Sequence, residues 1–408
     1  MGMKVYFSGI SGTGIGPLAE LAQDAGYEIC GSDLHRGAIA DEMDSRGVEV
    51  FYGEQDGEFL KKCHEAGNID WFVHTSALPK DHPELKIAQD LGIHCSKRDE
   101  FLAALVRDKN LKMIAVAGTH GKTTTTSMLV WAFEQLNIPI SYLVGTTLPW
   151  GNGGRFDPES EFFIYEADEY DRNFLAYHPY IAAITSVDYD HMDIYPTIED
   201  YRAAFRQFES QSENVVKFTT IAEGIDLVGE LRRIDATIAL EAIQKACPEI
   251  EREKIIDALN RFPGTGRRFE KIINGVYSDY GHHPVEIAAT LKMAKELKER
   301  DHYTGVAVVY QPHQNIRQHE IGDGYKDAFI DADKVFWLPT YLVREDPNLA
   351  VLTPADLIAT LSNSEIAEAA ECDDVLAQKI RQLHDENWLV ILLAAGPADA
   401  WFREVFTD

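Results

Sequence analysis

Short apolar segments alternate with longer amphipathic ones along most of the chain. Strand-like runs at residues 4–10, 27–31, 48–52 and 71–77 are separated by polar stretches of helical period. Each run is short and bounded by turn residues, which is typical of β-strands. Strands that alternate with helices in this way predict βαβ units and a parallel sheet. Residues 1–106 are therefore expected to form one α/β domain.

The same alternation continues to the C-terminus. We predict further strands at residues 113–117, 162–166, 181–187, 271–279, 305–310, 334–338 and 388–394. We predict helices at residues 235–247 and 253–260, and the turn-rich segment 261–266 follows them. This segment indicates a second boundary, so the predicted fold class is α/β with three domains, at residues 1–106, 107–265 and 266–408.

Length and charge narrow the class of protein further. A chain of 408 residues exceeds the size of one typical hydrophobic core, which agrees with several domains. The formal net charge of -29 opposes nucleic acids and anionic membrane surfaces, so neither is expected as a partner. The five cysteines are scattered singly, and no 18-residue apolar run or signal sequence is visible. These features predict a reduced, cytoplasmic protein with no membrane span, present as a monomer or weak homodimer.

The strongest chemical signal is a phosphate-binding loop at residues 118–123, which read Gly-Thr-His-Gly-Lys-Thr between a strand and a helix. Consecutive backbone N–H groups and the helix dipole suit phosphate there. Lys122 would meet the β- and γ-phosphates, and Thr123 would hold Mg²⁺. Val116 stands where a generic Walker A sequence has glycine, so this loop is a variant. ATP and Mg²⁺ are the expected cofactors.

Acidic and basic clusters follow the predicted strands. Carboxylates crowd residues 166–171 and 188–193, and they are expected to share a Mg²⁺-nucleotide site with the phosphate loop because strand ends converge at one crevice. Arginines and histidines gather at residues 266–268, 279–284 and 311–317, which suits phosphate and carboxylate groups. Near the N-terminus, residues 9–14 carry glycines in a dinucleotide-like pattern and Asp33 follows. This pattern predicts a second nucleotide moiety in the first domain.

Together these motifs resemble the Mur ligase family over the whole chain. The resemblance implies a Rossmann-like N-terminal domain that binds a UDP-sugar, a P-loop ATPase central domain and a Rossmann-like C-terminal domain that binds an amino acid. It implies ATP-dependent formation of an amide bond through an acyl phosphate, in the synthesis of a peptidoglycan precursor. The motifs are most similar to the branch that joins L-alanine to the lactyl carboxylate of UDP-N-acetylmuramate, the two expected small-molecule substrates.

The resemblance also implies roles for individual residues. The residues expected to bind ATP are Gly118, Thr119, His120, Gly121, Lys122, Thr123, Thr124, Arg268 and Asp279. Those expected to bind the UDP-sugar are Gly12, Thr13, Gly14, Asp33, Thr75 and Ser76. Tyr280, His282 and Arg317 would bind the amino acid, and Thr123, Glu166 and His191 would bind metal. The expected catalytic residues are Lys122, His191, His282 and Arg317.

Several positions depart from the family pattern and leave alternatives open. Gln314 replaces a basic residue, and Leu231, Arg232 and Asp235 replace the residues expected near adenine. Tyr170 is more typical of the branch that attaches a tripeptide to the same UDP-sugar during murein recycling. A degenerate nucleotide-binding regulator is the alternative from a different class of protein, although the retained phosphate and metal residues favour an enzyme.

Overall fold

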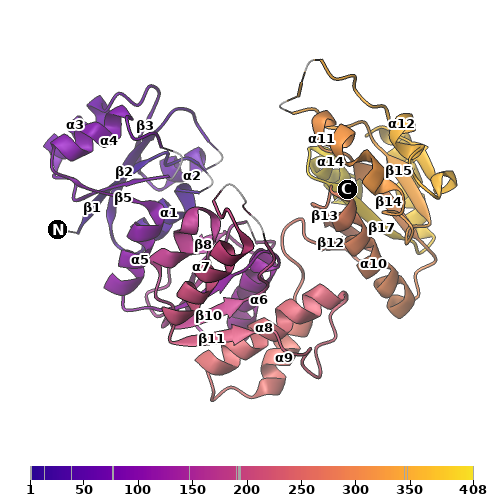
Figure 1. Ribbon diagram of the computed structural model, residues 1–408, viewed down its shortest axis with the longest axis horizontal. Helices are drawn as coiled ribbons and strands as arrows, with labels where there is room; N and C mark the ends of the chain where they lie inside the picture. The colour runs from indigo at the N-terminus through magenta and orange to yellow at the C-terminus, as the bar shows by residue number, and fades with distance from the viewer. Residues whose placement is uncertain are drawn as a thin grey trace. The chain divides into compact units, whose positions relative to one another are not determined.

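The computed structural model has an α/β fold with three sheets that are mainly parallel (Figure 1). The described residues are 2–12, 14–37, 39–75, 78–146, 148–189, 191, 194–343, 345–346 and 348–407. The chain divides into two compact units, one of residues 1–225 and 234–262 and the other of residues 226–233 and 263–408. The first unit contains two of the sheets and the second unit contains the third.

The first sheet is fully parallel, with strand order β3-β2-β1-β4-β5. Its strands are β1 (Lys4–Ser8), β2 (Glu28–Asp33), β3 (Glu49–Tyr52), β4 (Trp71–His74) and β5 (His94–Lys97). Its helices are α1 (Gly16–Asp24), α2 (Ala40–Ser45), α3 (Glu58–Ala66), α4 (Pro83–Asp90) and α5 (Arg98–Asp108). The strand order reverses between β1 and β4, the position at which open α/β sheets bind ligands beyond the carboxyl ends of the strands.

A buried carboxylate anchors the carboxyl ends of β1 and β2. Glu84 of α4 is 1% exposed and accepts hydrogen bonds from the hydroxyls of Tyr6, Ser8 and Ser32 at 2.6, 2.7 and 2.6 Å. These hydrogen bonds satisfy both oxygens of the buried carboxyl group and offset the cost of burying it. The ends of β1, which precedes the glycine loop at residues 9–14, and of β2, which follows α1, are thereby held together.

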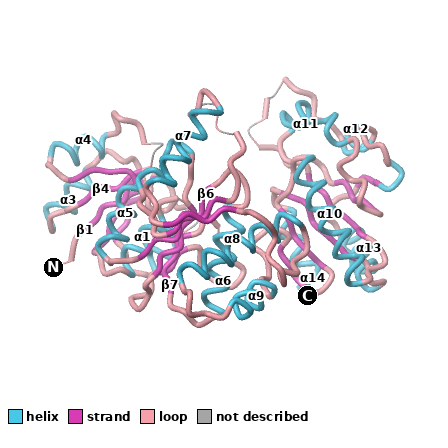
Figure 2. The backbone as a smooth tube through the Cα atoms, turned by 60° about the horizontal axis from the view of Figure 1, so that its bottom comes forward, coloured by secondary structure: helices cyan, strands magenta, loops and turns pink. Residues whose placement is uncertain are grey.

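The second sheet has the order β11-β10-β6-β9-β7-β8, and all its pairs are parallel except β7 with β8. Its strands are β6 (Lys112–Ala117), β7 (Ile140–Leu143), β8 (Gly154–Arg155), β9 (Phe162–Glu166), β10 (Ile181–Ile184) and β11 (Asn214–Lys217). Its helices are α6 (Lys122–Gln135), the 3-10 helix η1 (Tyr170–Ala176), α7 (Ile198–Ser210), α8 (Glu230–Ala246) and α9 (Arg252–Asn260). Figure 2 shows α7 over one face and α6 with α8 over the other. Both faces are covered, so β6 is buried from Met113 to Ala117, as its continuous apolar run predicts.

The third sheet has the order β12-β13-β17-β14-β15-β16, with only β12 and β13 antiparallel. Its strands are β12 (Glu270–Ile273), β13 (Val276–Asp279), β14 (Val306–Gln311), β15 (Lys334–Trp337), β16 (Ala367–Ala369) and β17 (Leu389–Ala394). Its helices are α10 (Pro284–Asp301), α11 (Asn315–Ile321), α12 (Pro354–Ile358), α13 (Asp374–Asp385), α14 (Ala398–Thr407) and the 3-10 helices η2 (Gly322–Tyr325) and η3 (Ser364–Ile366).

Two predicted strands are corrected by the structure. Residues 271–279 form a hairpin rather than one strand, because Gly275 has a φ of 78° and follows Asn274 in the Asn-Gly turn that joins β12 to β13. The strand predicted at residues 181–187 ends at Ile184. Beyond it, the Thr185 hydroxyl donates to His120 O and the Ser186 hydroxyl accepts from the His120 N–H, so this segment contacts the phosphate loop.

Candidate functional site

The phosphate loop, residues 118–123, connects the end of β6 to the start of α6 and can be built only with glycine at two positions. Gly118 has a φ of 144° and Gly121 a φ of 84°. A Cβ atom at Gly118 would lie 2.2 Å from Thr185 Oγ1, and one at Gly121 would lie 2.4 Å from Asp235 Oδ1. The loop therefore needs glycine both for its left-handed backbone and for its close packing against β10 and α8.

Backbone contacts to the segment after β10 hold the loop in place. The N–H groups of Thr119 and His120 donate to the carbonyl and the hydroxyl of Ser186 at 3.2 and 3.0 Å. The first N–H groups of α6 have no acceptor within the helix, and the helix dipole favours negative charge at this end. The predicted ATP-binding residues 118–124 thus stand at an anion-binding helix terminus.

Lys122 and His191 meet at one buried carboxylate. Lys122 Nζ donates to Gly118 O at 2.6 Å and to Glu169 Oε1 at 2.9 Å. His191 Nε2 lies 3.5 Å from the same Oε1, and the Glu169 side chain is fully buried. Sequence reasoning placed Glu169 only within an acidic cluster, whereas the structure makes it the group that positions two predicted catalytic residues.

Thr123 and Glu166, two of the three predicted metal ligands, are hydrogen-bonded to each other. Thr123 Oγ1 donates to Glu166 Oε1 at 2.8 Å, and Glu166 Oε2 accepts from the Gly145 N–H at 3.0 Å. A hydroxyl and a carboxylate are oxygen ligands of the kind that Mg²⁺ takes, so this pair fits the cation. Within the described part of the chain, no three His, Cys, Asp or Glu side chains are grouped to hold a metal ion. Three residues of the second acidic cluster lie outside that part: Asp190, Met192 and Asp193.

A second glycine loop, residues 9–14, lies where the order of the first sheet reverses. Ser11 N–H donates to Asp33 Oδ2 at 3.0 Å, which ties the loop after β1 to the end of β2. A Cβ atom at Gly9 would lie 3.8 Å from Thr75 Cγ2, so the loop also faces the end of β4. Three strand ends therefore bring Gly12, Gly14, Asp33 and Thr75 to one edge of the sheet. Two predicted residues of this group lie outside the described residues: Thr13 and Ser76.

Arg98 is a residue beside this glycine loop that sequence reasoning missed. Its Nη1 lies 3.1 Å from the position that a Cβ atom of Gly14 would occupy, and its Nη2 donates to Tyr165 OH at 3.2 Å. The missed signal was β5, whose polar sequence His-Cys-Ser-Lys does not read as a strand. Had β5 been recognised, Arg98 would have stood out as a cation at the carboxyl end of a parallel strand.

In the second unit, the predicted ATP contacts belong to the turn around β13. Asp279 accepts from the N–H groups of Phe269 and Gly281 at 2.6 and 2.7 Å, and burial raises the pKa of its carboxyl. The Arg268 guanidinium lies 5.9 Å from the ring centre of Tyr280. Asp279 thus shapes the turn that presents Arg268 and Tyr280.

The predicted amino-acid residues lie together in the same unit. His282 Nε2 contacts a guanidinium nitrogen of Arg317, and its Nδ1 lies 3.0 Å from Tyr280 O. Arginine only donates, so Nε2 is the acceptor and Nδ1 carries the proton. The ring of His313 lies 5.4 Å from that of His282, and burial lowers the pKa of both histidines. Tyr280, His282 and Arg317 therefore form one cluster around a neutral imidazole.

Three of the positions that depart from the family pattern have defined surroundings. Gln314 Nε2 donates to Val343 O at 3.3 Å, so its amide is held by the loop that follows β15. Leu231 is 63% exposed, whereas Asp235 is buried beside Gly121 of the phosphate loop. Of the three, Asp235 is thus the one in contact with a predicted nucleotide-binding residue.

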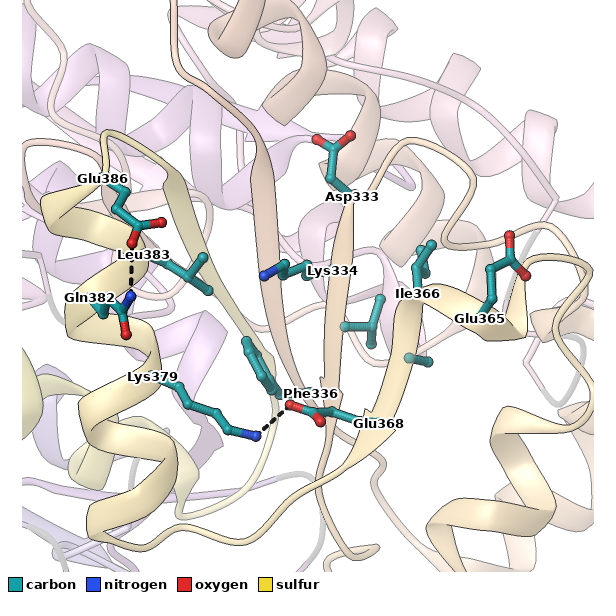
Figure 3. A pocket seen from close by; sticks show the side chains of 12 residues that line it. Asp333, Lys334, Phe336, Glu365, Ile366, Glu368, Lys379, Gln382, Leu383 and Glu386 are labelled. Carbon is teal, nitrogen blue, oxygen red and sulfur yellow. Dashed lines mark hydrogen bonds and ion pairs between the residues drawn. The ribbon is translucent and has the colours of Figure 1, made fainter.

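The second unit has two hollows, and the predicted site residues do not line either of them. One, of about 470 Å³, lies between β15, β16 and α13, where Lys379 pairs with Glu368 and Gln382 with Glu386 (Figure 3). It is lined by no predicted site residue. The other, of about 590 Å³, lies at the start of α10 and includes His283, the neighbour of His282. No helix in the described residues is long and apolar enough to cross a membrane.

Comparison with known proteins finds relatives along the full chain. A UDP-N-acetylmuramate–L-alanine ligase of Syntrophomonas wolfei is 31% identical over an alignment of 467 positions, which covers 98% of this chain and 95% of the relative. The ligase of the same name from Clostridium acetobutylicum is 30% identical, with 98% of this chain and 96% of the relative covered.

Solved structures share the fold. The UDP-N-acetylmuramate-alanine ligase of Thermotoga maritima superposes with a TM-score of 0.73 at 20% identity, covering 99% of this chain and 98% of the other. A murein peptide ligase from Psychrobacter arcticus reaches a TM-score of 0.57 at 20% identity, covering 100% of this chain and 98% of the other. Residues 4–110 match the Mur ligase family, catalytic domain, and residues 116–225 match the Mur ligase middle domain. With the phosphate loop and the three sheets described above, these matches show that the chain belongs to the Mur ligase family.

Proposed function

We propose that this protein joins L-alanine to the lactyl carboxylate of UDP-N-acetylmuramate, with cleavage of ATP to ADP and phosphate. The observation that carries the proposal is the phosphate loop, where Lys122 and His191 converge on Glu169 beside the Thr123–Glu166 pair. This arrangement suits transfer of a phosphoryl group, because cations and helix N–H groups face the position where negative charge develops. The relatives named above act on the same substrates, which supports this choice of acid and amine.

The reaction has two steps. An oxygen of the substrate carboxylate attacks the γ-phosphorus of ATP, the bond to the bridging oxygen breaks, and ADP leaves. The amine of L-alanine then attacks the carbonyl carbon of the acyl phosphate, loses a proton, and inorganic phosphate leaves as the amide forms. Lys122 would balance charge on the transferred phosphoryl group in the first step. Both steps depend on charge stabilisation rather than on a protein nucleophile.

Mg²⁺ bound by Thr123 and Glu166, with a further contribution from His191, would neutralise phosphate charge. The buried Glu169 would keep Lys122 and His191 close before nucleotide arrives. Phosphate oxygens would then compete with Glu169 for the ammonium group, so the pair sets Lys122 in place without neutralising it permanently. This gives the buried ion pair a positioning role.

Arg317 would bind the carboxylate of L-alanine, with Tyr280 alongside. His282 is neutral near pH 7 because burial lowers its pKa. Once Arg317 turns to the amino-acid carboxylate, the Nε2 lone pair of His282 becomes available to accept the amine proton. Arg268 and Asp279 are proposed to serve ATP. The three-domain division at residues 1–106, 107–265 and 266–408 is part of the same proposal, as is a cytoplasmic location, which the five free cysteines support.

Release of ADP and phosphate with UDP-N-acetylmuramate tests the proposal. Turnover should require L-alanine, with glycine and L-serine compared at equal concentration. Turnover only with the tripeptide L-alanyl-γ-D-glutamyl-meso-diaminopimelate would replace the proposal by murein recycling. Tight ATP binding without phosphate release for any amine would favour a regulator. Tyr170, the residue that favoured the tripeptide, packs its ring 5.2 Å from that of His191 in the first unit. Tyr170 therefore lies beside a residue proposed to act on phosphate, and its identity does not distinguish L-alanine from the tripeptide as the amine substrate.

A further inference from the structure

The turn at residues 265–268 presents Arg268 in a backbone conformation that other groups must stabilise. The residues on either side of Arg268, namely Arg267 and Phe269, have φ angles of 53° and 49°. Residues other than glycine rarely adopt this left-handed conformation, and they persist in it only where the surrounding structure holds them. On one side, the Phe269 N–H donates to Asp279 Oδ2 at 2.6 Å. The acceptor of the Arg267 N–H on the other side therefore helps to set where Arg268 lies.

That acceptor is Glu270, and an arginine of the C-terminal helix α14 holds it in place. The Arg267 N–H donates to Glu270 Oε2 at 2.7 Å. Arg403 donates from Nη1 and Nη2 to the two carboxylate oxygens of Glu270 at 3.0 and 2.6 Å. Glu270 is 8% exposed, so this bidentate pair is largely shielded from solvent. The Arg403 side chain thereby connects α14 to the turn.

Asp399, four residues before Arg403 in α14, fixes the direction of the guanidinium. Asp399 Oδ2 accepts from Arg403 Nε at 2.9 Å, and its Oδ1 accepts from the Ser278 hydroxyl. Ser278 is fully buried in β13. All three guanidinium nitrogens of Arg403 therefore have carboxylate acceptors, and a planar group bonded in this way has one orientation.

The two neighbouring arginines of the turn have different surroundings. The Arg267 guanidinium donates to Ala394 O and lies 4.8 Å from the ring centre of Tyr280. Its Nε lies 3.8 Å from a carboxylate oxygen of α14, so this cation is balanced within the unit. Arg268 forms no ion pair within the part of the chain that the structure describes, and its guanidinium lies 5.9 Å from the same ring centre. Arg268 is thus the cation of the turn that remains available to an anionic ligand.

We propose that Arg403 is a positioning residue for nucleotide binding, because through Glu270 it holds the turn that presents Arg268 to the phosphates of ATP. The inference rests on the proposed function, which assigns Arg268 to ATP. Arg403 acts through the Glu270 carboxylate and the Arg267 N–H rather than by contact with the nucleotide. The C-terminal helix α14 is thereby part of the structure that supports nucleotide binding.

Steady-state kinetics of the full chain test this assignment. R403A should raise the KM for ATP about 5–10-fold, because the turn loses a charge-assisted support, and should change the KM for UDP-N-acetylmuramate by less than about two-fold. R403K keeps the charge and a donor for Glu270, so it should recover part of the loss. R381A is the matched control, because Arg381 Nε donates to Val405 O and so anchors the same helix at a different point. The KM for ATP in R381A should stay at the wild-type value.

A double-mutant cycle with R268A separates positioning from a general loss of stability. If Arg403 acts through Arg268, the variant R268A/R403A should have the same KM for ATP as R268A alone. E270Q keeps the size of the side chain but removes its charge, so it should raise the KM for ATP in the same direction and replaces R403A if that variant does not fold.

A wild-type KM for ATP in folded R403A and E270Q would overturn the inference. It would also be overturned if the effects of R403A and R268A multiplied, or if R381A raised the KM for ATP as much as R403A does. A wild type without turnover of UDP-N-acetylmuramate and L-alanine would instead overturn the proposed function. In that case the Kd of a non-hydrolysable ATP analogue, measured by calorimetry in the same variants, decides the inference by the same comparisons.

Discussion

The two glycine loops of the first unit have the same position between a strand and a helix, but their nearby cationic side chains come from different parts of the chain. Each follows a central strand of a parallel sheet, β1 or β6, and leads into a helix, α1 or α6. The phosphate loop contains its own cation, Lys122, at the first position of α6. The glycine loop of residues 9–14 has none, and the nearest guanidinium on Gly14 comes from α5.

This difference explains why the sequence shows the residues around the phosphate loop more completely than those around the loop at residues 9–14. In the phosphate loop, glycines and cation stand within six residues, so spacing along the chain reports spacing in space. Around the loop at residues 9–14, Asp33 comes from β2 and Arg98 from α5, so these two side chains lie far from the loop in the sequence. The sequence pattern indicates the glycines and Asp33 there but not Arg98. The comparison predicts that each loop can be damaged without damage to the other.

The largest effect is expected for K122A. Loss of the ammonium group should lower kcat about 100–1000-fold, because it removes the cation aimed at the transferred phosphoryl group. The Kd of UDP at the first loop should stay within about two-fold of the wild-type value. Ordinary surface substitutions change a free energy by no more than about 0.5 kcal/mol. Phosphate release and UDP calorimetry measure the two quantities, with K112A at the exposed start of β6 as control. A parallel loss of UDP binding would show that the loops are not separable.

The second largest effect is expected for E166Q, whose activity at limiting Mg²⁺ should be at least about 10-fold below that of the wild type. The amide keeps the hydrogen-bonding size of the carboxylate but lacks the charge that holds the cation beside Thr123. Partial recovery at high Mg²⁺ is expected in a titration of rate against metal concentration. E161Q, a 62% exposed carboxylate just before β9, is the control. An E166Q enzyme with wild-type Mg²⁺ dependence would remove Glu166 from the metal site.

D33A should have a smaller effect confined to the first loop. Asp33 accepts the Ser11 N–H, so its loss frees the loop backbone, and the KM for the UDP-sugar should rise about 5–10-fold. The KM for ATP should not change. D41A is the control, because Asp41 is a 98% exposed carboxylate in α2. Equal increases in both KM values would contradict the independence of the two loops.

The smallest expected effect lies outside both loops, in the pH dependence of stability. Burial lowers the pKa of His282, so the folded state binds fewer protons than the unfolded state as pH falls below the ordinary value of about 6.5. The free energy of unfolding should therefore decrease as the pH is lowered from 7 to 5.5. H282Q should flatten this decline by roughly 1–2 °C in Tm, measured by thermal unfolding at each pH. H319Q, at an exposed position in α11, should keep the wild-type slope, and an identical slope in H282Q would refute the expectation.

Much of the architecture could be predicted from the pattern of apolar and polar residues along the chain. The α/β class and most strands followed from short apolar runs between helical segments, because strands covered on both faces are apolar throughout. The polar sequence of β5 did not predict a strand. The Asn-Gly turn within residues 270–279 was not recognised, so a single strand was predicted there. For β5, the pairing with β4 rather than local composition decides that the segment is a strand, whereas the Asn-Gly pair is a local turn signal within the apolar run.

The amino-acid sequence by itself determined the phosphate loop, because its glycines, its lysine and its threonine are neighbours along the chain. It also placed Glu166, His191 and the His282 segment near strand ends. Only the tertiary structure decided that Glu169 joins Lys122 to His191, and that Arg98 faces Gly14. These contacts join residues far apart in the chain, and the packing of the sheets with their helices brings them within a few ångströms. Spacing in a sequence carries no information about such distances, whereas the fold sets them.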